Sequence, residues 1–103
     1  MELFMISKKR DVNAKLELKD EKYILKKGSK VSSKISESFR SCKKVKKRRE
    51  NNINKDFILL NDIVFRSSST AGEFVLGTSC NGKIKWKNIE GKTLKEIQNT
   101  MEV

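Results

Sequence analysis

Residues 65–94 constrain the fold most, because several local structure signals follow one another within this short stretch. Ser67-Ser68-Ser69-Thr70 offers hydroxyl groups that can cap a helix, and Thr70 and Glu73 have the spacing of a capping box. Gly77 can then close the helix in the left-handed conformation. The stretch therefore begins with a predicted short helix. Its apolar face is expected to consist of Ala71, Phe74 and Val75.

The next part of this stretch contains a hairpin signal. Asn81-Gly82 is typical of a tight β-hairpin. Apolar and basic residues then alternate from Lys83 to Lys87, which is the pattern of a strand with one buried face. We therefore expect Ile84 and Trp86 to face inward and the three lysines to face outward.

A last helix is predicted after the tryptophan. Thr93 and Glu96 repeat the capping-box spacing at its start. Apolar residues follow at helical spacings of three and four. They are Leu94, Ile97 and Met101.

The N-terminal quarter predicts a β-meander. Residues 3–6 form an unbroken apolar run, expected to be a strand buried on both faces, and apolar residues alternate with polar ones over 12–18. Asp20-Glu21 is a plausible turn into a third strand over 23–27, in which Tyr23 and Leu25 point one way and Ile24 the other. Gly28-Ser29 is expected to end that strand, because glycine supplies backbone freedom.

The middle of the chain predicts a helix and a second hairpin. Ile35, Phe39 and Cys42 fall at helical spacing within residues 32–52, and Ser32 or Ser33 is available as the N-cap. The basic residues after Cys42 surround the helix, so we expect that end to fray unless an anion binds. Short strands at 57–60 and 63–65 are expected to pair around Asn61-Asp62.

These segments predict a single α+β domain over residues 1–103, with an antiparallel sheet of about five or six short strands and two or three helices. The chain contains no histidine, and Cys42 and Cys80 lie far apart without a CxxC motif. We therefore expect neither a metal site nor a cofactor, and no enzyme activity. No apolar run approaches the roughly 18 residues of a membrane span, so a cytoplasmic location without membrane contact is expected.

The excess positive charge is concentrated in one segment. The chain has a net charge of +11, and residues 22–49 contain twelve basic residues but only one acidic residue, Glu37. Such a segment presents a positive potential that attracts polyanions. A solvated basic loop that only aids solubility is the alternative. The candidate nucleic-acid contacts are Lys43, Lys44, Lys46, Lys47, Arg48 and Arg49, assisted by Lys83, Lys85 and Lys87.

A second candidate site is an anion or ligand groove formed by Ser67, Ser69, Thr70 and Trp86. The free amides and the positive end of a helix can hold a phosphate, and an exposed tryptophan can stack on a base. The alternative is that the hydroxyl groups only cap the helix and Trp86 is a core anchor.

Several short motifs occur in a fixed order along the chain. They are Asn13-Ala14, Lys27-Gly28-Ser29-Lys30, Phe65-Arg66-Ser67-Ser68-Ser69-Thr70-Ala71, Val75-Leu76-Gly77, Asn81-Gly82, Trp86-Lys87 and Gly91-Lys92-Thr93-Leu94. This set resembles the small domain of unknown function found at the C-terminal end of many GIY-YIG-type endonuclease proteins and in restriction-modification contexts. It is also distantly similar to the restriction-enzyme-adenine-methylase-associated (RAMA) domain.

The resemblance implies an accessory role in recognising DNA or modified DNA. Family members commonly have a proline within the serine cluster and an alanine run after it, where this chain has Ser68 and Thr70-Ala71-Gly72. The GIY and YIG strands are missing here, so the resemblance implies no cleavage chemistry. We therefore expect a non-catalytic nucleic-acid-binding module. A protein-interaction or regulatory module is the alternative, and the oligomeric state stays open.

Overall fold

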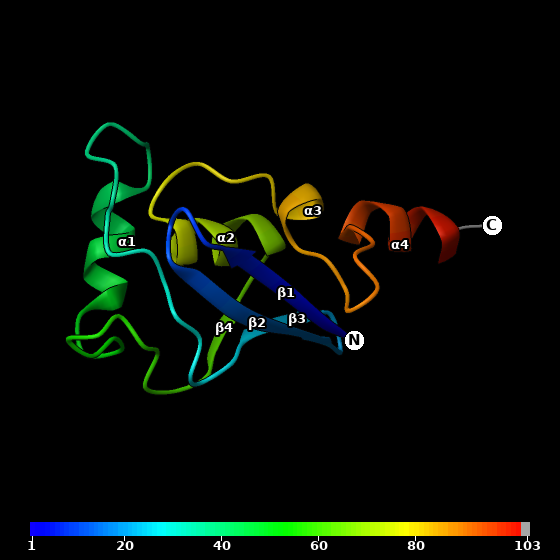
Figure 1. Ribbon diagram of the computed structural model, residues 1–103, viewed down its shortest axis with the longest axis horizontal. Helices are drawn as coiled ribbons and strands as arrows, with labels where there is room; N and C mark the ends of the chain where they lie inside the picture. Colours follow the sequence, from blue (N-terminus) through cyan, green and yellow to red (C-terminus); the bar gives the residue numbers. More distant parts are fainter. Residues whose placement is uncertain (102–103) are drawn as a thin grey trace.

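The computed structural model describes residues 1–101, with the side chains of residues 1–99. Within this range a four-stranded antiparallel sheet combines with four helices, which confirms the predicted α+β class with fewer strands than expected. The strands are β1 (Glu2–Ser7), β2 (Val12–Lys19), β3 (Lys22–Leu25) and β4 (Ile63–Phe65), and they lie side by side in that order. Figure 1 shows α2 beside the sheet, with α1 and α4 at opposite ends of the molecule.

The N-terminal meander forms largely as predicted. Asp20 and Glu21 have φ values of 53° and 63°, as a tight turn between β2 and β3 requires. The alternation in β2 sets its register, because Val12, Ala14 and Leu16 are all buried. The expectation for β1 was wrong in one respect, since the Ile6 side chain is 68% exposed. β1 is an edge strand of the sheet, and only one of its faces is buried.

The main core lies between the sheet and helix α2 (Ser68–Leu76). Ala71, Phe74 and Val75 face this core, as predicted from their spacing. Gly77 ends α2 at a φ of 71°, which is the predicted left-handed closure. The capping box differs from the prediction, because it joins Ser67 to Thr70 and leaves out Glu73.

Helix α1 (Cys42–Arg49) is much shorter than the predicted helix over residues 32–52. Residues 32–36 instead run beside the end of α2, where the Ser32 amide donates to Val75 O and the Ser36 amide to Gly77 O. These long-range bonds hold the segment out of a helix. Ser32 and Ser33 therefore do not cap α1. A small second core packs under α1 and contains Phe39, Cys42 and Val45, with Ile35 against it.

The predicted hairpin between residues 57–60 and 63–65 does not form. β4 pairs with β3, and Asp62 accepts a hydrogen bond from the Lys27 amide at 2.8 Å. The segment before it makes isolated bridges, Lys30 with Ile58 and Ile53 with Leu59. The amide and carbonyl groups of residues 28–31 take up the pairing capacity that the hairpin needs.

Helix α3 (Gly82–Lys85) replaces the hairpin predicted at Asn81-Gly82. The Asn81 side chain caps this short helix, and the Gly82 amide donates to Ser69 Oγ at 3.0 Å. A methyl group at residue 82 would overlap the Ser68 backbone, so glycine is needed for packing against α2. Ile84 consequently points outward and is 49% exposed, contrary to the prediction.

Helix α4 (Leu94–Met101) follows the predicted cap closely. The Glu96 amide donates to Thr93 Oγ1 at 3.2 Å, and the Thr93 amide donates to Glu96 Oε1 at 3.3 Å. Leu94 is buried and Ile97 packs on the core, whereas the Met101 side chain lies outside the described residues. Among residues 1–101, none of the helices has the length or apolar content to cross a bilayer.

Candidate functional site

Helix α1 presents the densest group of basic side chains, and its two faces differ sharply. Cys42, Val45 and Arg49 are buried on one face. Because successive residues turn by about 100° around a helix, Lys43, Lys44, Lys47 and Arg48 occupy a continuous arc on the other. All four are exposed. We call these four residues the α1 basic arc.

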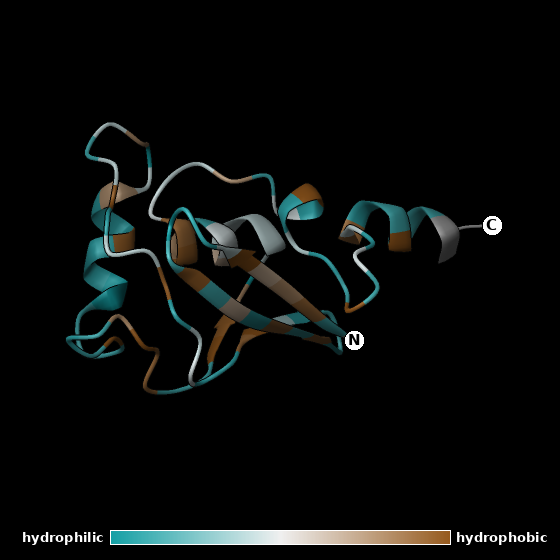
Figure 2. Cartoon of the chain, viewed as in Figure 1, coloured by the Kyte–Doolittle hydropathy of each residue, from teal (hydrophilic) through white to brown (hydrophobic). Residues whose placement is uncertain are grey.

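The α1 basic arc is at one end of the molecule. Figure 1 shows α1 standing apart from the sheet, at the end opposite α4. Figure 2 shows it coloured mainly as hydrophilic. Within the described residues, the ammonium groups of Lys43, Lys44 and Lys47 have no carboxylate partner. Their charges are therefore available to an external anion.

Arg49 is a correction to the predicted contacts, because its guanidinium lies in the interior. Nη1 donates to Ser32 O at 2.7 Å, and Nη2 donates to Phe74 O at 2.7 Å and to Val75 O at 3.3 Å. The carbonyls of Phe74 and Val75 belong to the last turn of α2, where helical partners are missing. Burial lowers the pKa of Arg49 to about 10, since desolvation disfavours the charged form. Arg49 thus joins the end of α1 to the end of α2.

This anchor also explains why the basic run is helical. The prediction that it would fray considered repulsion among lysines alone. Arg49 and the buried Val45 attach the helix to the rest of the fold. The observed contacts therefore provide the stabilisation that an anion was expected to supply.

Two other predicted contacts are partly engaged within the protein. Lys46 Nζ lies 2.6 Å from Glu37 Oε1, and this hydrogen bond raises the pKa of Lys46. Arg48 donates to Val64 O at 2.7 Å, and its guanidinium lies 4.2 Å from the centre of the Phe65 ring. Arg48 keeps an exposed charge in a fixed position, whereas the charge of Lys46 is offset by a carboxylate.

The remaining predicted lysines do not extend the α1 basic arc. Lys83, Lys85 and Lys87 are exposed, as expected, but they lie on and after α3. Figure 1 shows α2 between α1 and α3. The structure therefore forms two separate cationic surfaces in place of one continuous strip.

The predicted ligand groove does not exist in the form proposed. The side chains of Ser67 and Thr70 bind each other and the start of α2, while Ser69 Oγ accepts from the Gly82 amide. Trp86 is fully buried, and its Nε1 donates to Ser68 O at 2.9 Å. Ser67 and Thr70 therefore cap α2 and Trp86 is a core anchor, as the alternatives stated, while Ser69 holds the start of α3.

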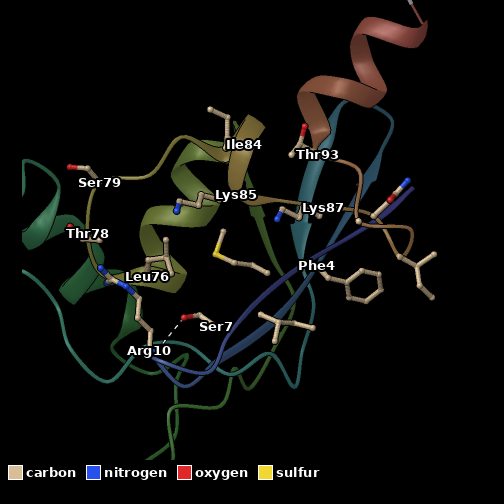
Figure 3. Close-up of a pocket in the computed structure, with 15 residues that line it drawn as sticks. Phe4, Ser7, Arg10, Leu76, Thr78, Ser79, Ile84, Lys85, Lys87 and Thr93 are labelled. Atoms are coloured by element: carbon tan, nitrogen blue, oxygen red, sulfur yellow. Dashed lines mark hydrogen bonds between the residues drawn. The ribbon is translucent and has the colours of Figure 1, made fainter.

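A groove that the sequence did not predict lies beside α3. It has a volume of about 680 Å³ and is lined by parts of β1, the β1–β2 turn, α3 and the loop before α4. Figure 3 shows Arg10 and Lys85 approaching it from different elements, with Phe4 and Ile84 also at its wall. The lysine alternation at 83–87 was the available signal, but the sequence did not indicate that Arg10 would join it.

Metal-binding side chains and the Cys80 thiol give no further candidate site among the described residues. Within residues 1–101, no cluster of three or more Cys, Asp or Glu side chains could hold a metal ion. Burial raises the pKa of the Cys80 thiol to about 11, so this side chain is a protonated packing group at neutral pH.

Comparison with known proteins gives one match. Residues 4–98 match a family model described as a domain of unknown function (DUF4357). Neither a curated protein nor a solved structure matches the chain.

Proposed function

Starting from the fact that the chain belongs to the DUF4357 family, we propose that it is a nucleic-acid-binding module whose main contact is the α1 basic arc. The module holds the phosphate backbone and performs no bond-breaking step itself. DNA is the favoured ligand, because the sequence resembles domains that accompany GIY-YIG endonucleases.

The observation that carries the proposal is the arrangement of Lys43, Lys44, Lys47 and Arg48. Four exposed cations share one side of a helix, and none of the four has a carboxylate partner among the described residues. Lysine ammonium groups on flexible stems act as point charges and can follow phosphates of varied geometry. Contacts of this type give affinity and orientation without reading the base sequence.

The support under α1 makes this surface ordered before a ligand binds. Arg49 hydrogen-bonds to three carbonyl groups and Val45 packs in the second core. The backbone of the helix therefore requires little ordering on association, and a lower ordering cost favours affinity. A solvated basic loop, the alternative to a binding surface, would lack this support.

The proposal predicts a specific loss when the charges are removed. A triple variant Lys43→Gln, Lys44→Gln, Lys47→Gln is titrated against a fluorescein-labelled DNA duplex and a matching single strand at several salt concentrations. The wild type is expected to show a slope of log K against log salt of about −4 on duplex, if four phosphates are neutralised. The variant is expected to reduce the size of that slope by about 3, because three phosphate contacts are lost.

A matched variant separates the site from the net charge. Lys19→Gln, Lys22→Gln, Lys95→Gln removes the same charge from exposed residues outside α1. It should keep most of the wild-type affinity and slope. Equal losses of affinity in the two variants would show that overall charge, and not the α1 basic arc, causes the effect. A wild type that does not bind DNA or RNA at low salt would contradict the proposal.

A further inference from the structure

The groove beside α3 contains an incompletely paired sheet edge. The outer edge of β1 pairs with another segment of the chain at one residue, Phe4. The Phe4 amide donates to Lys87 O at 2.6 Å, and the Phe4 carbonyl accepts from the Lys87 amide at 3.0 Å. This contact is a single antiparallel bridge. On both sides of this bridge the segment that contains Lys87 turns away from β1, because α3 precedes Lys87 and a tight turn around Asn88 follows Lys87.

Ile6 is the next residue of β1 that faces this edge. Backbone groups of alternate residues in a strand point the same way, so the Ile6 amide and carbonyl point outward like those of Phe4. An antiparallel partner would place residue 85 opposite Ile6, but the Lys85 amide is bound within α3 to Asn81 O. Among the described residues, no backbone group pairs with this outward side of Ile6.

Exposed aliphatic side chains gather around the same groove. Ile6 is 68% exposed, Ile84 49% and Ile89 89%, and all three line it. These are three of the six large apolar residues that the described part of the protein leaves exposed, and they include the two most exposed. Their concentration at one groove indicates an interaction surface, since scattered single residues would be ordinary.

The charge of the groove is entirely positive. Arg10, Lys85 and Lys87 line it, and none of the described lining residues is acidic. In addition, none of these three side chains is paired with a carboxylate among the described residues. A ligand with negative charge and aliphatic surface is therefore complementary to it.

We propose that this groove binds an extended segment of a partner protein that carries alternating acidic and aliphatic residues. The segment adds as a strand at Ile6, its aliphatic side chains pack on Ile6, Ile84 and Ile89, and its carboxylates meet Arg10 and Lys85. Strand addition of this kind takes affinity from main-chain hydrogen bonds and specificity from alternate side chains. The site is separate from the α1 basic arc and does not depend on the nucleic-acid proposal.

A peptide is favoured over a nucleic-acid strand by the nature of the lining. Single strands are held by stacking on exposed aromatic rings. Here the exposed apolar groups are aliphatic, and Phe4 is the one aromatic residue among the described lining residues. A free amide and carbonyl at a sheet edge match a polypeptide backbone, which nucleic acids lack.

The test uses a fluorescein-labelled peptide of alternating glutamate and valine, titrated into the full chain by fluorescence anisotropy. Binding is expected, with the amides of Ile6 and Lys87 shifting in NMR spectra. Arg10→Glu with Lys85→Glu is expected to weaken binding by about tenfold or more, because two charge pairs become repulsive. Lys27→Glu with Lys55→Glu makes the same charge change on exposed residues outside the groove and should have a much smaller effect.

A second peptide tests strand addition without changing the protein. The same sequence with N-methyl groups on alternate amides keeps its charge but loses donors on one edge, and each of the two possible methylation phases is measured. At least one phase should bind about tenfold more weakly or worse. The proposal would be overturned if both methylated peptides bound as tightly as the unmethylated one, or if a lysine-valine peptide bound equally well. It would also be overturned if a thymidine oligonucleotide displaced the peptide and lost this ability in the Arg10→Glu with Lys85→Glu variant.

Discussion

At the scale of single residues, the basic side chains divide into those that hold the fold and those that face solvent. Arg49 and Lys47 are two positions apart in the same basic run, yet one is buried and the other exposed. The difference comes from their angular positions on α1. Arg49 points at the end of α2 and satisfies carbonyl groups that would otherwise be buried without partners. Its role is therefore structural.

Replacing Arg49 by methionine tests this role. Arg49→Met keeps a long side chain but removes the donors for Ser32 O and Phe74 O, whereas Val75 O keeps the Ser32 amide. Buried carbonyls without partners are costly. The free energy of unfolding, measured by urea denaturation, is expected to fall by about 3 kcal/mol. The control Lys47→Met should change it by about 0.5 kcal/mol or less, as for most surface substitutions. Similar stabilities of the two variants would contradict the anchor.

At the scale of elements, packing against α2 overrides local preference. Gly72 lies inside this helix, where alanine would ordinarily be favoured by about 1 kcal/mol. A methyl group at residue 72 would overlap Cys80 Sγ and come within 3.2 Å of Cys80 Cβ. Gly82 meets Ser68 in the same way. The two glycines allow the loop over 78–81 and helix α3 to lie directly on α2.

A double-mutant cycle on Gly72 and Cys80 measures this packing. Gly72→Ala is expected to lower the unfolding free energy by about 1 to 3 kcal/mol, opposite in sign to the effect of helix propensity. Cys80→Ala removes the overlapping sulfur atom, so the double variant should be more stable than the sum of the two single changes predicts. Additive effects, or a more stable Gly72→Ala protein, would show that the contact is not tight.

At the scale of the whole molecule, ion pairs remove positive charge from some surfaces and leave it on others. Carboxylates neutralise Lys15, Lys26 and Lys30 on the sheet side of the protein. The α1 basic arc and the groove beside α3 retain unpaired cations among the described residues. These two cationic surfaces lie on either side of α2 and carry part of the excess positive charge of the chain.

The pairing of Asp62 makes stability depend on pH. The Lys27 amide and then the Lys26 ammonium lower the pKa of Asp62 below its usual value of 3.8. The contribution of the Asp62 carboxylate to the free energy of unfolding is therefore present above pH 3.8. It is lost as the pH falls through the lowered pKa of the folded state. Asp62→Ala should cost about 1 kcal/mol or less at neutral pH, because the side chain is largely exposed and screened.

Urea denaturation across the acid range checks this expectation. The curves of wild type and Asp62→Ala should converge as the pH falls below 3.8. The control is Asp56→Ala, because the Asp56 carboxylate makes no hydrogen bond or ion pair among the described residues. A constant difference between wild type and Asp62→Ala at every pH would contradict the role assigned to the carboxylate.

The sequence predicted the local parts of the fold well. The alternation in β2, the Asp20-Glu21 turn, the closure at Gly77 and the capping box of Thr93 with Glu96 all form. Each depends on neighbours within a few residues. One local prediction failed, because the capping box of α2 joins Ser67 to Thr70. The larger failures concern segments whose hydrogen bonds go to distant partners, namely the long helix over 32–52, the hairpin at residues 57–65 and the hairpin at Asn81-Gly82.

The sequence by itself determined that the protein is an α+β domain with a large positive charge centred on one short segment. Composition and local spacing decide these properties, because they depend on which residues are present and on their near neighbours. Only the tertiary structure decided which cations stay exposed and unpaired, since Arg49 is buried against the end of α2 and Lys46 is paired with Glu37. It also formed the groove at Ile6, because that site combines a sheet edge, a turn and a helix far apart in the chain.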